Sequence, residues 1–173
     1  SIIQVAEYGQ RLELIENPNT HWRVGTAVAD AFPVIGERYI VPKLIALLPN
    51  ESIPAPVRER VTQSLVELNN SDTVLQLLPL LSDESIQKSV RDQIAYTLGY
   101  IGDPRAIPAL KNELVAGSLT WTVGRALSYL NLPPEETLAF LKDETIEAPA
   151  RWGLTRSAST WDDSYIPTII EYA

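Results

Sequence analysis

The chain repeats its apolar residues at a spacing of 33, and this repeat constrains the fold more than any other feature of the sequence. Val24, Val57 and Val90 occupy equivalent positions in three successive repeats. The same register holds for five further sets of residues: Val28, Val61 and Ile94; Phe32, Leu65 and Leu98; Val41, Val74 and Ile107; Leu44, Leu77 and Leu110; Leu48, Leu81 and Leu114. A repeat this short cannot bury its apolar face alone, so neighbouring repeats must stack against one another.

Each repeat is predicted to begin with an amphipathic helix. In "SVRDQIAYTLGYIG" the apolar residues Val90, Ile94, Leu98 and Ile101 are separated by four, four and three residues, which places them on one helical face. Gly102 is expected to end this helix, because glycine readily takes the left-handed conformation found at helix ends.

A second helix is predicted directly afterwards, in "DPRAIPALKNEL". Its buried face holds Ile107, Leu110 and Leu114. Pro108 is tolerated because it lies in the first turn, where its missing N–H has no intrahelical partner. Each repeat is therefore a hairpin of two helices.

The later repeats follow the same plan less closely. Four apolar residues align with the Val90 stripe at an offset of 29: Leu119, Val123, Leu127 and Leu130. In "PPEETLAFL", Pro133 marks the entry of the next helix, and Glu135 and Glu136 lie at its positive end. The last repeat is expected to place its helices in "APARWGLTRSAST" and "DDSYIPTIIEYA", where Asp162 or Asp163 can cap the second.

These patterns predict an all-α fold. We expect an α-α superhelix (solenoid) of about five helical hairpins preceded by an N-terminal capping helix. The expected boundaries are residues 1–17 for the capping helix and 19–50, 51–83, 84–117, 118–145 and 146–173 for the repeats, which together form one array.

The segment "VRDQIAYTLGYIGDPRAIPAL" resembles a HEAT-like repeat of the kind described for phycobilisome-lyase proteins. That pattern runs Val-Arg, small residues, Leu-Gly, Ile-Gly, Asp-Pro and Ile-Pro-Ala-Leu. The third repeat matches almost throughout, whereas the second replaces Ile-Gly-Asp-Pro with "LNNS". The resemblance implies an armadillo-like helical array, and its members include phycobilin lyase subunits and many proteins that hold partners.

The charge balance argues against nucleic acid as a partner. The chain has 14 Lys and Arg against 22 Asp and Glu, a net charge of −8, which repels phosphate backbones. No apolar run approaches the roughly 20 residues of a membrane helix, so no membrane association is expected. The absence of Cys removes thiolate nucleophiles and Cys-based zinc sites and fits a reducing compartment. We therefore expect a cytoplasmic protein.

No catalytic or metal-ligating residue is predicted. His21 is the single histidine, and "NTHWRVG" places it at a helix entry with no positioned nucleophile nearby. Adjacent acidic pairs, such as Asp143 with Glu144, lie where helices begin or end. Capping is a better explanation of these pairs than metal binding or acid–base catalysis. The chain is therefore expected to lack enzymatic activity, although a lyase subunit stays open as an alternative.

Arginines recur at one position of the repeat. Arg58 and Arg91 are equivalent, and Arg151 lies near the same place in the last repeat, while Asp72 and Asp103 lie near the turns. The resembled family uses such residues in charge ladders between hairpins, so a structural ladder is favoured over a partner-binding role.

Glycine and tryptophan occur together in this chain. Gly25 and Gly124 are the last residues of two similar segments, "WRVG" and "WTVG", and Gly153 follows Trp152. A helical glycine costs about 1 kcal/mol relative to alanine, which close helix packing or room for a bulky neighbour would offset. Packing between repeats is the favoured role of the tryptophans. The alternative is a pocket for a flat ligand such as a bilin, with contacts from Trp22, Trp121 and Trp152.

The second helices of a solenoid generally line its concave, partner-binding face. Leu47, Leu80 and Glu113 are equivalent residues of these helices, and Leu75 flanks them. If they are exposed, the leucines form an apolar docking patch. The alternative is that they contact the neighbouring hairpin.

The leading hypothesis is a non-catalytic scaffold that binds a protein partner on this concave face without a cofactor. The alternative is a subunit of a phycobilin lyase or a bilin-handling chaperone, whose partner would be a phycobiliprotein. Without Cys, such a chain would have to deliver the bilin to a Cys on another protein. A third possibility, favoured by the absence of Met, is a scaffold segment of a larger protein.

Overall fold

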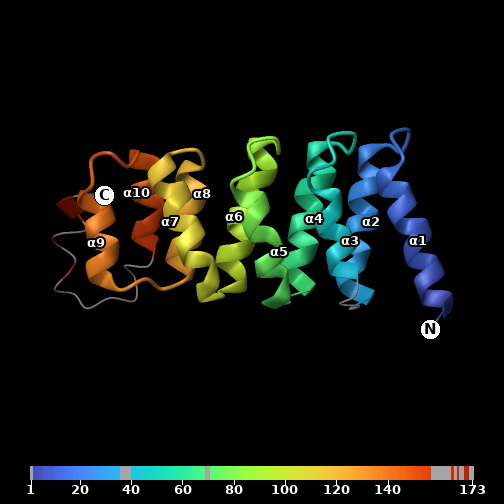
Figure 1. Ribbon diagram of the computed structural model, residues 1–173, viewed down its shortest axis with the longest axis horizontal. Helices are drawn as coiled ribbons and strands as arrows, with labels where there is room; N and C mark the ends of the chain where they lie inside the picture. The colour runs from blue at the N-terminus through green and yellow to red at the C-terminus, as the bar shows by residue number, and fades with distance from the viewer. Residues whose placement is uncertain are drawn as a thin grey trace. The chain divides into compact units, whose positions relative to one another are not determined.

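The computed structural model describes residues 2–35, 40–68, 71–156, 165, 167, 170 and 171. Most of these residues lie in α-helices and none of them lies in a strand, so the predicted all-α helical-repeat fold is confirmed. The α-helices labelled in Figure 1 are α1 (Ile2–Glu16), α2 (Trp22–Ile35), α3 (Val41–Leu47), α4 (Ala55–Leu68), α5 (Ser71–Leu81), α6 (Lys88–Ile101), α7 (Ile107–Ala116), α8 (Thr120–Tyr129), α9 (Pro134–Lys142) and α10 (Ala148–Leu154).

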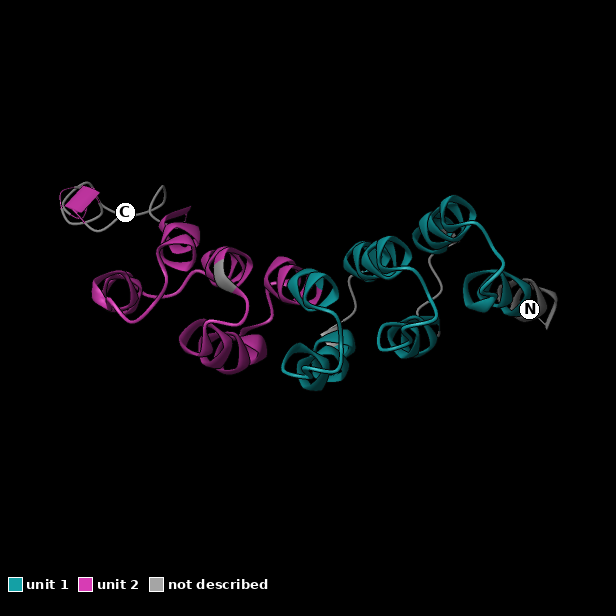
Figure 2. Cartoon of the chain, turned by 90° about the horizontal axis from the view of Figure 1, so that it is seen from above, with its two compact units in different colours: residues 1–93 teal, residues 94–173 magenta. Residues whose placement is uncertain are grey.

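The chain forms two compact units, residues 1–93 and residues 94–173, with the boundary inside α6. In the first unit α2 packs against α4, and α3 packs against α4 and α5. In the second unit α8 packs against α10 and α7, and α9 packs against α10. Within each unit the hairpins line up so that their first helices form one row and their second helices another (Figure 2).

The helices pair along the chain in the order that the repeat indicates. Residues 19–50 hold α2 and α3, 51–83 hold α4 and α5, 84–117 hold α6 and α7, and 118–145 hold α8 and α9. Helix α1 lies within residues 1–17, and α10 opens the last repeat. The second helix expected there, in "DDSYIPTIIEYA", falls largely outside the described residues, as do its expected caps Asp162 and Asp163.

The apolar stripes of the second and third repeats form the core. Val61, Leu65, Ile94 and Leu98 are fully buried, and each such side chain contributes about 1.5–3 kcal/mol on burial. In the first repeat the stripe begins later than expected, because Val24 is 46% exposed at the start of α2. The neighbouring Gly25, rather than Val24, faces Val57 of α4.

The turn inside the third repeat forms as predicted. Gly102 has a φ of +75° and follows α6. The Asp103 carboxylate then accepts a hydrogen bond of 2.9 Å from the N–H of Arg105, which caps a short 3₁₀ helix. Pro108 lies in the first turn of α7.

A buried apolar residue precedes the first helix of each later hairpin. These residues are Ile53, Ile86, Leu119 and Ile146. Leu119 therefore matches Ile86, 33 residues earlier, and not Val90, so the predicted offset of 29 is wrong by about one helical turn. The missing turn is at the end of α8, which has 10 residues against 14 in α6.

The turns that precede α4, α6 and α10 share one hydrogen-bonding pattern. The side-chain oxygens of Asn50, Asp83 and Asp143 each accept hydrogen bonds from the N–H and hydroxyl of the residue two positions later. The hydroxyl of Ser85, followed by its N–H, lowers the pKa of Asp83 below its usual value. The corresponding groups of Thr145 lower the pKa of Asp143.

Two of the recurring arginines, Arg58 and Arg151, cap helices of the preceding hairpin. Arg58 Nη1 donates to the carbonyl oxygen of Leu48 at 3.1 Å, and Arg151 Nη1 donates to that of Leu141 at 3.2 Å. Leu48 is the C-cap residue directly after α3, and Leu141 lies in the last turn of α9. The ladder therefore runs from guanidinium to carbonyl groups, which carry the negative end of the helix dipole.

The acidic residues of the predicted ladder lie near the turns, as expected. Asp103 pairs with Arg105 inside its own turn, and Asp72 lies in the first turn of α5. Arg91, at the position equivalent to Arg58, is also buried. The predicted ladder is thus structural, but the hydrogen bonds of Arg58 and Arg151 go to backbone oxygens.

Candidate functional site

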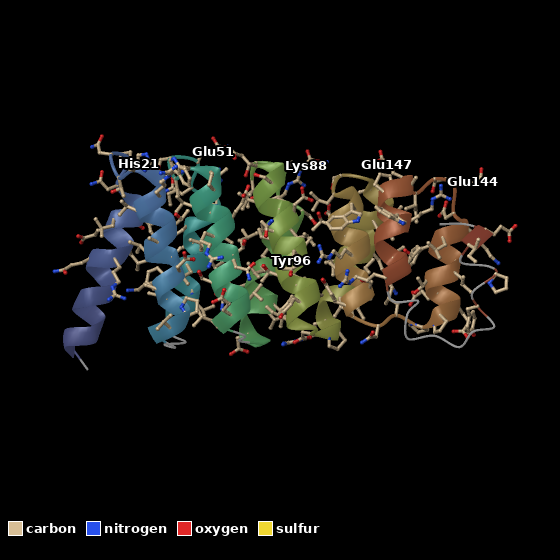
Figure 3. The ribbon with its side chains drawn as sticks, turned by 180° about the vertical axis from the view of Figure 1, so that it is seen from behind. His21, Glu51, Lys88, Tyr96, Glu144 and Glu147 are labelled. Carbon is tan, nitrogen blue, oxygen red and sulfur yellow. The ribbon has the colours of Figure 1, made fainter. Side chains whose placement is uncertain are left out.

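In the second unit, α6, α8, α10 and the residues directly after α10 carry a group of aromatic and arginine side chains that we call the aromatic surface. Its members are Tyr96, Tyr100, Trp121, Arg125, Tyr129, Trp152 and Arg156. Figure 3 labels Tyr96 on α6, and it also labels Glu144 and Glu147 in the segment that leads from α9 into α10.

Arg125 lies at the centre of the aromatic surface. Its Cζ is 4.9 Å from the ring centroid of Trp121, 5.4 Å from that of Tyr96 and 5.6 Å from that of Tyr129. Its Nε donates to the Tyr129 hydroxyl at 3.0 Å. Each cation–π contact is worth about 0.5–1 kcal/mol at an exposed site. Rings and one hydroxyl therefore position this cation, and no carboxylate of the described residues pairs with it.

The tyrosines also contact one another. Tyr96 stacks on Tyr100 with centroids 5.9 Å apart, and Tyr129 meets both rings edge-on at 6.1 and 6.2 Å. The guanidinium of Arg156 lies 5.8 Å from the Tyr129 centroid. Tyr100 remains 58% exposed, so the network is packed yet accessible.

Two hollows adjoin this network. The larger one, of about 680 Å³, is lined by Trp121, Ala148, Pro149 and Trp152. The smaller one, of about 260 Å³, is lined by Trp121, Arg125, Trp152, Gly153, Thr155 and Arg156. The two tryptophans line both hollows and are 41% and 65% exposed. An apolar hollow and a cationic hollow therefore share one indole-lined border.

Glycines bring α8 and α10 together beneath the tryptophans. A Cβ added at Gly124 would lie 2.0 Å from the carbonyl oxygen of Ala150, and one at Gly153 would lie 2.6 Å from that of Trp121. The two backbones therefore touch, with no room for a side chain between them. This close packing explains the glycines, and the alternative of room for a bulky neighbour does not apply here.

The predicted aromatic contacts are divided between the units. Trp121 and Trp152 meet at the two hollows of the second unit, whereas Trp22 belongs to the first unit. Trp22 stacks on His21 with centroids 5.8 Å apart and is 44% exposed. His21 Nδ1 accepts a hydrogen bond from the N–H of Arg23 at 3.3 Å, so its predicted position at a helix entry is confirmed.

The predicted partner-binding leucines are only partly accessible. Leu75 is 53% exposed and Leu80 is half-buried, but Leu47 is 3% exposed and Glu113 is 6% exposed. The expectation that Leu47 and Glu113 face a partner is therefore wrong. Leu47 is buried in the unit where α3 packs on α4 and α5, and the Glu113 carboxylate accepts a hydrogen bond from the Ser118 hydroxyl.

Sequence reasoning missed Arg125 and the three tyrosines. The available signal was their spacing, because Tyr96 and Tyr100, like Trp121, Arg125 and Tyr129, are four residues apart and share a helical face. Such stripes are usually core residues, and only the contact between neighbouring helices distinguishes them as a surface.

Within the described part of the chain, no three His, Asp or Glu side chains gather in a way that could hold a metal ion. Glu135 and Glu136 lie in the first turn of α9, as expected for helix-end residues, and Glu136 pairs with Lys111. None of the described helices has the length and apolar character needed to span a membrane.

Comparison with known families places this architecture. The sequence model for HEAT repeats matches residues 41–131, which is more than half of the 173 residues. The chain belongs to the HEAT-repeat family. The matched HEAT repeats run from α3 to the end of α8 and include Trp121, Arg125 and Tyr129. The phycobilisome-lyase subtype stays a prediction, and no curated protein matched the sequence.

Proposed function

We propose that this HEAT-repeat chain is a non-catalytic module that binds a protein partner through its aromatic surface. The exposure of Trp121 and Trp152 on either side of one apolar hollow is the observation that carries the proposal. Large apolar side chains left in water favour removal from it, and contiguous exposed patches mark interaction sites.

The composition of the aromatic surface suits a protein partner. Trp, Tyr and Arg are the residue types most enriched at the energetic centres of protein interfaces. The aromatic surface consists of these three types alone. An aromatic ring provides a large contact area for few rotatable bonds, so its ordering on binding costs little entropy.

The support beneath the aromatic surface is rigid, which favours binding further. Gly124 and Gly153 fix α8 against α10, and Arg125 is held by Trp121 and two tyrosines. Side chains that are positioned before binding lose less freedom when a partner arrives. The proposal therefore assigns the partner to the row of first helices, and not to the second helices that the sequence favoured.

Quantitative capture from an extract of the source cells tests this function. Three immobilised proteins are compared by mass spectrometry: the wild type, the double variant Trp121→Ala/Trp152→Ala, and Leu75→Ser as a matched control. Leu75 is also an exposed apolar residue, but it lies on α5 of the first unit. Circular dichroism checks that all three proteins are folded.

We expect one protein to be retained by the wild type and by Leu75→Ser and to be lost from the double variant. Purified, that protein should bind the wild type at least tenfold more tightly than the double variant, about 1.4 kcal/mol. Equal retention of every captured protein by the wild type and the double variant would show that the aromatic surface does not bind the partner.

A second candidate is a bilin-handling protein, either a lyase subunit or a chaperone. It is favoured by one observation, that two indoles line a hollow beside the guanidinium groups of Arg125 and Arg156. Indole faces stack on a flat conjugated pigment, and guanidinium groups bind its carboxylates. The chain contains no Cys, so it would hold the pigment without a thioether bond.

Titration of the protein with a free bilin tests the second candidate. If the chain handles bilins, the visible absorbance of the pigment shifts with a saturable dependence on protein concentration, and Trp121→Ala/Trp152→Ala abolishes the shift. An absorbance that is the same with the wild type and the double variant rejects this candidate and leaves the protein partner.

A further inference from the structure

We infer that the aromatic surface binds an extended peptide segment in which a proline lies within a few residues of a carboxylate side chain. This inference rests on the proposed function and names the class of partner. The two hollows differ in chemistry and share Trp121 and Trp152, so one peptide can fill both.

The larger hollow suits the proline. Trp121, Ala148, Pro149 and Trp152 line it, and none of these side chains is charged. Both tryptophans remain accessible in the unbound protein. Aromatic-lined grooves bind proline-rich segments because a polyproline II peptide is already extended and loses little entropy on binding. A proline ring can pack flat against an indole face here.

The smaller hollow suits the carboxylate. Arg125 and Arg156 line it together with Thr155. A guanidinium group can donate two parallel hydrogen bonds to one carboxylate, which makes arginine the preferred partner of that group. Arg125 is positioned by rings and by the Tyr129 hydroxyl, so its charge is oriented by neutral groups.

The net charge of the chain indicates how much the apolar hollow and the arginines each contribute to the binding affinity. The chain carries −8 overall, so a peptide with acidic groups alone would be repelled at long range. The apolar anchor must then supply the larger part of the affinity, and the local arginines supply a smaller part together with the preference for an acidic side chain. An acidic group without proline should bind weakly, and proline without an acidic group should bind less tightly than the two together.

Fluorescence anisotropy with four labelled peptides of equal length tests the inference. One contains proline and glutamate, one contains proline and glutamine, one contains glutamate in a glycine–serine background, and one contains glycine and serine only. Each is titrated with the wild type, Trp152→Ala, Arg125→Gln and the control Leu75→Ser. Melting temperatures confirm that every variant is folded.

We expect the proline–glutamate peptide to bind at least about tenfold more tightly than each of the others. Trp152→Ala should remove the preference for proline. Arg125→Gln should remove the preference for glutamate over glutamine and keep the preference for proline, and Leu75→Ser should change neither. This double dependence separates recognition of the charge from general loss of the surface.

Equal binding of the four peptides, or an unchanged glutamate preference in Arg125→Gln, overturns the inference. The proposed function would still stand if the capture experiment recovers a protein that depends on Trp121 and Trp152. If the capture experiment finds no such protein while the proline–glutamate peptide binds as expected, the peptide preference of the aromatic surface stands and the proposed function, binding of a cellular protein, is wrong.

Discussion

The backbone of Gly124 touches the backbone of Ala150, because a Cβ added to Gly124 would lie 2.0 Å from the Ala150 carbonyl oxygen. Gly124→Ala should therefore push α10 away from α8 and lower the melting temperature of the protein by several degrees. Gly9→Ala is the matched control, since nothing lies within 4 Å of its added Cβ in α1. Helix propensity predicts that this control stabilises the protein by about 0.5–1 kcal/mol. Equal effects of the two substitutions on the melting temperature would contradict the close packing.

Arg58 should matter to stability far more than Arg60 on the same helix. Arg58 is fully buried and donates to the Leu48 carbonyl, whereas Arg60 is half-buried at the surface and pairs with Asp30. Arg58→Ala leaves a cavity and an unpaired carbonyl and should lower the free energy of unfolding by about 2–4 kcal/mol. Arg60→Ala should lower it by less than about 1 kcal/mol. Urea titration measures both, and a similar loss for the two variants would show that the helix cap contributes nothing special.

The Asp83 and Asp143 turns make stability depend on pH in the acid range. The hydroxyl and N–H of the residue two positions later lower the pKa of each carboxyl in the folded chain. The resulting stabilisation is fully present above the unfolded pKa, about 3.9, and is lost as pH falls through the lowered folded value.

The variant Asp83→Asn/Asp143→Asn tests this dependence. Asn50 already makes the same turn with an amide oxygen, so the double variant should keep both turns. Its melting temperature should fall less than that of the wild type between about pH 6 and about pH 3. Parallel curves for the two proteins would mean that these carboxylates do not contribute.

Substitutions of Trp152 and Leu154, two residues of the same short helix, should affect different properties: the first peptide binding and the second stability. Trp152 is 65% exposed, and Leu154 is 1% exposed. Leu154→Ala should cost about 2–5 kcal/mol of stability, whereas Trp152→Ala should change stability little and reduce only binding. Thermal melting and peptide binding measured on both variants check this, and a large loss of stability in Trp152→Ala would make the tryptophan a core residue.

The fold could be predicted because it depends on local and repeated patterns. The stripe of Ile94 and Leu98, the glycine at Gly102 and the proline at Pro108 each specify helical structure within a few residues. The same features recur at a spacing of 33, so one hairpin predicts its neighbours. The offset of 29 was wrong because an apolar residue at a helix entry and one in a helix stripe look alike in the sequence.

The site was harder to predict because it depends on which helix faces are covered by neighbours. Leu47 and Leu75 are both leucines of second helices, yet one is 3% and the other 53% exposed. Arg58 caps a helix through a backbone carbonyl, and the position of that carbonyl cannot be predicted from a pattern of side chains in the sequence. Trp121 and Trp152 were singled out by the glycines beside them, but their meeting at one hollow follows from the approach of α8 and α10.

Site-specific photocrosslinking shows whether a protein partner contacts the aromatic surface. A photoreactive phenylalanine analogue replaces Trp152 in one protein and Leu75 in another, and both are irradiated in an extract of the source cells. The two sites are similarly exposed, at 65% and 53%, so they have comparable access to a partner. We expect a discrete covalent adduct with one protein from position 152 and none from position 75. An adduct from position 75 alone would contradict this expectation and assign binding to the second helices.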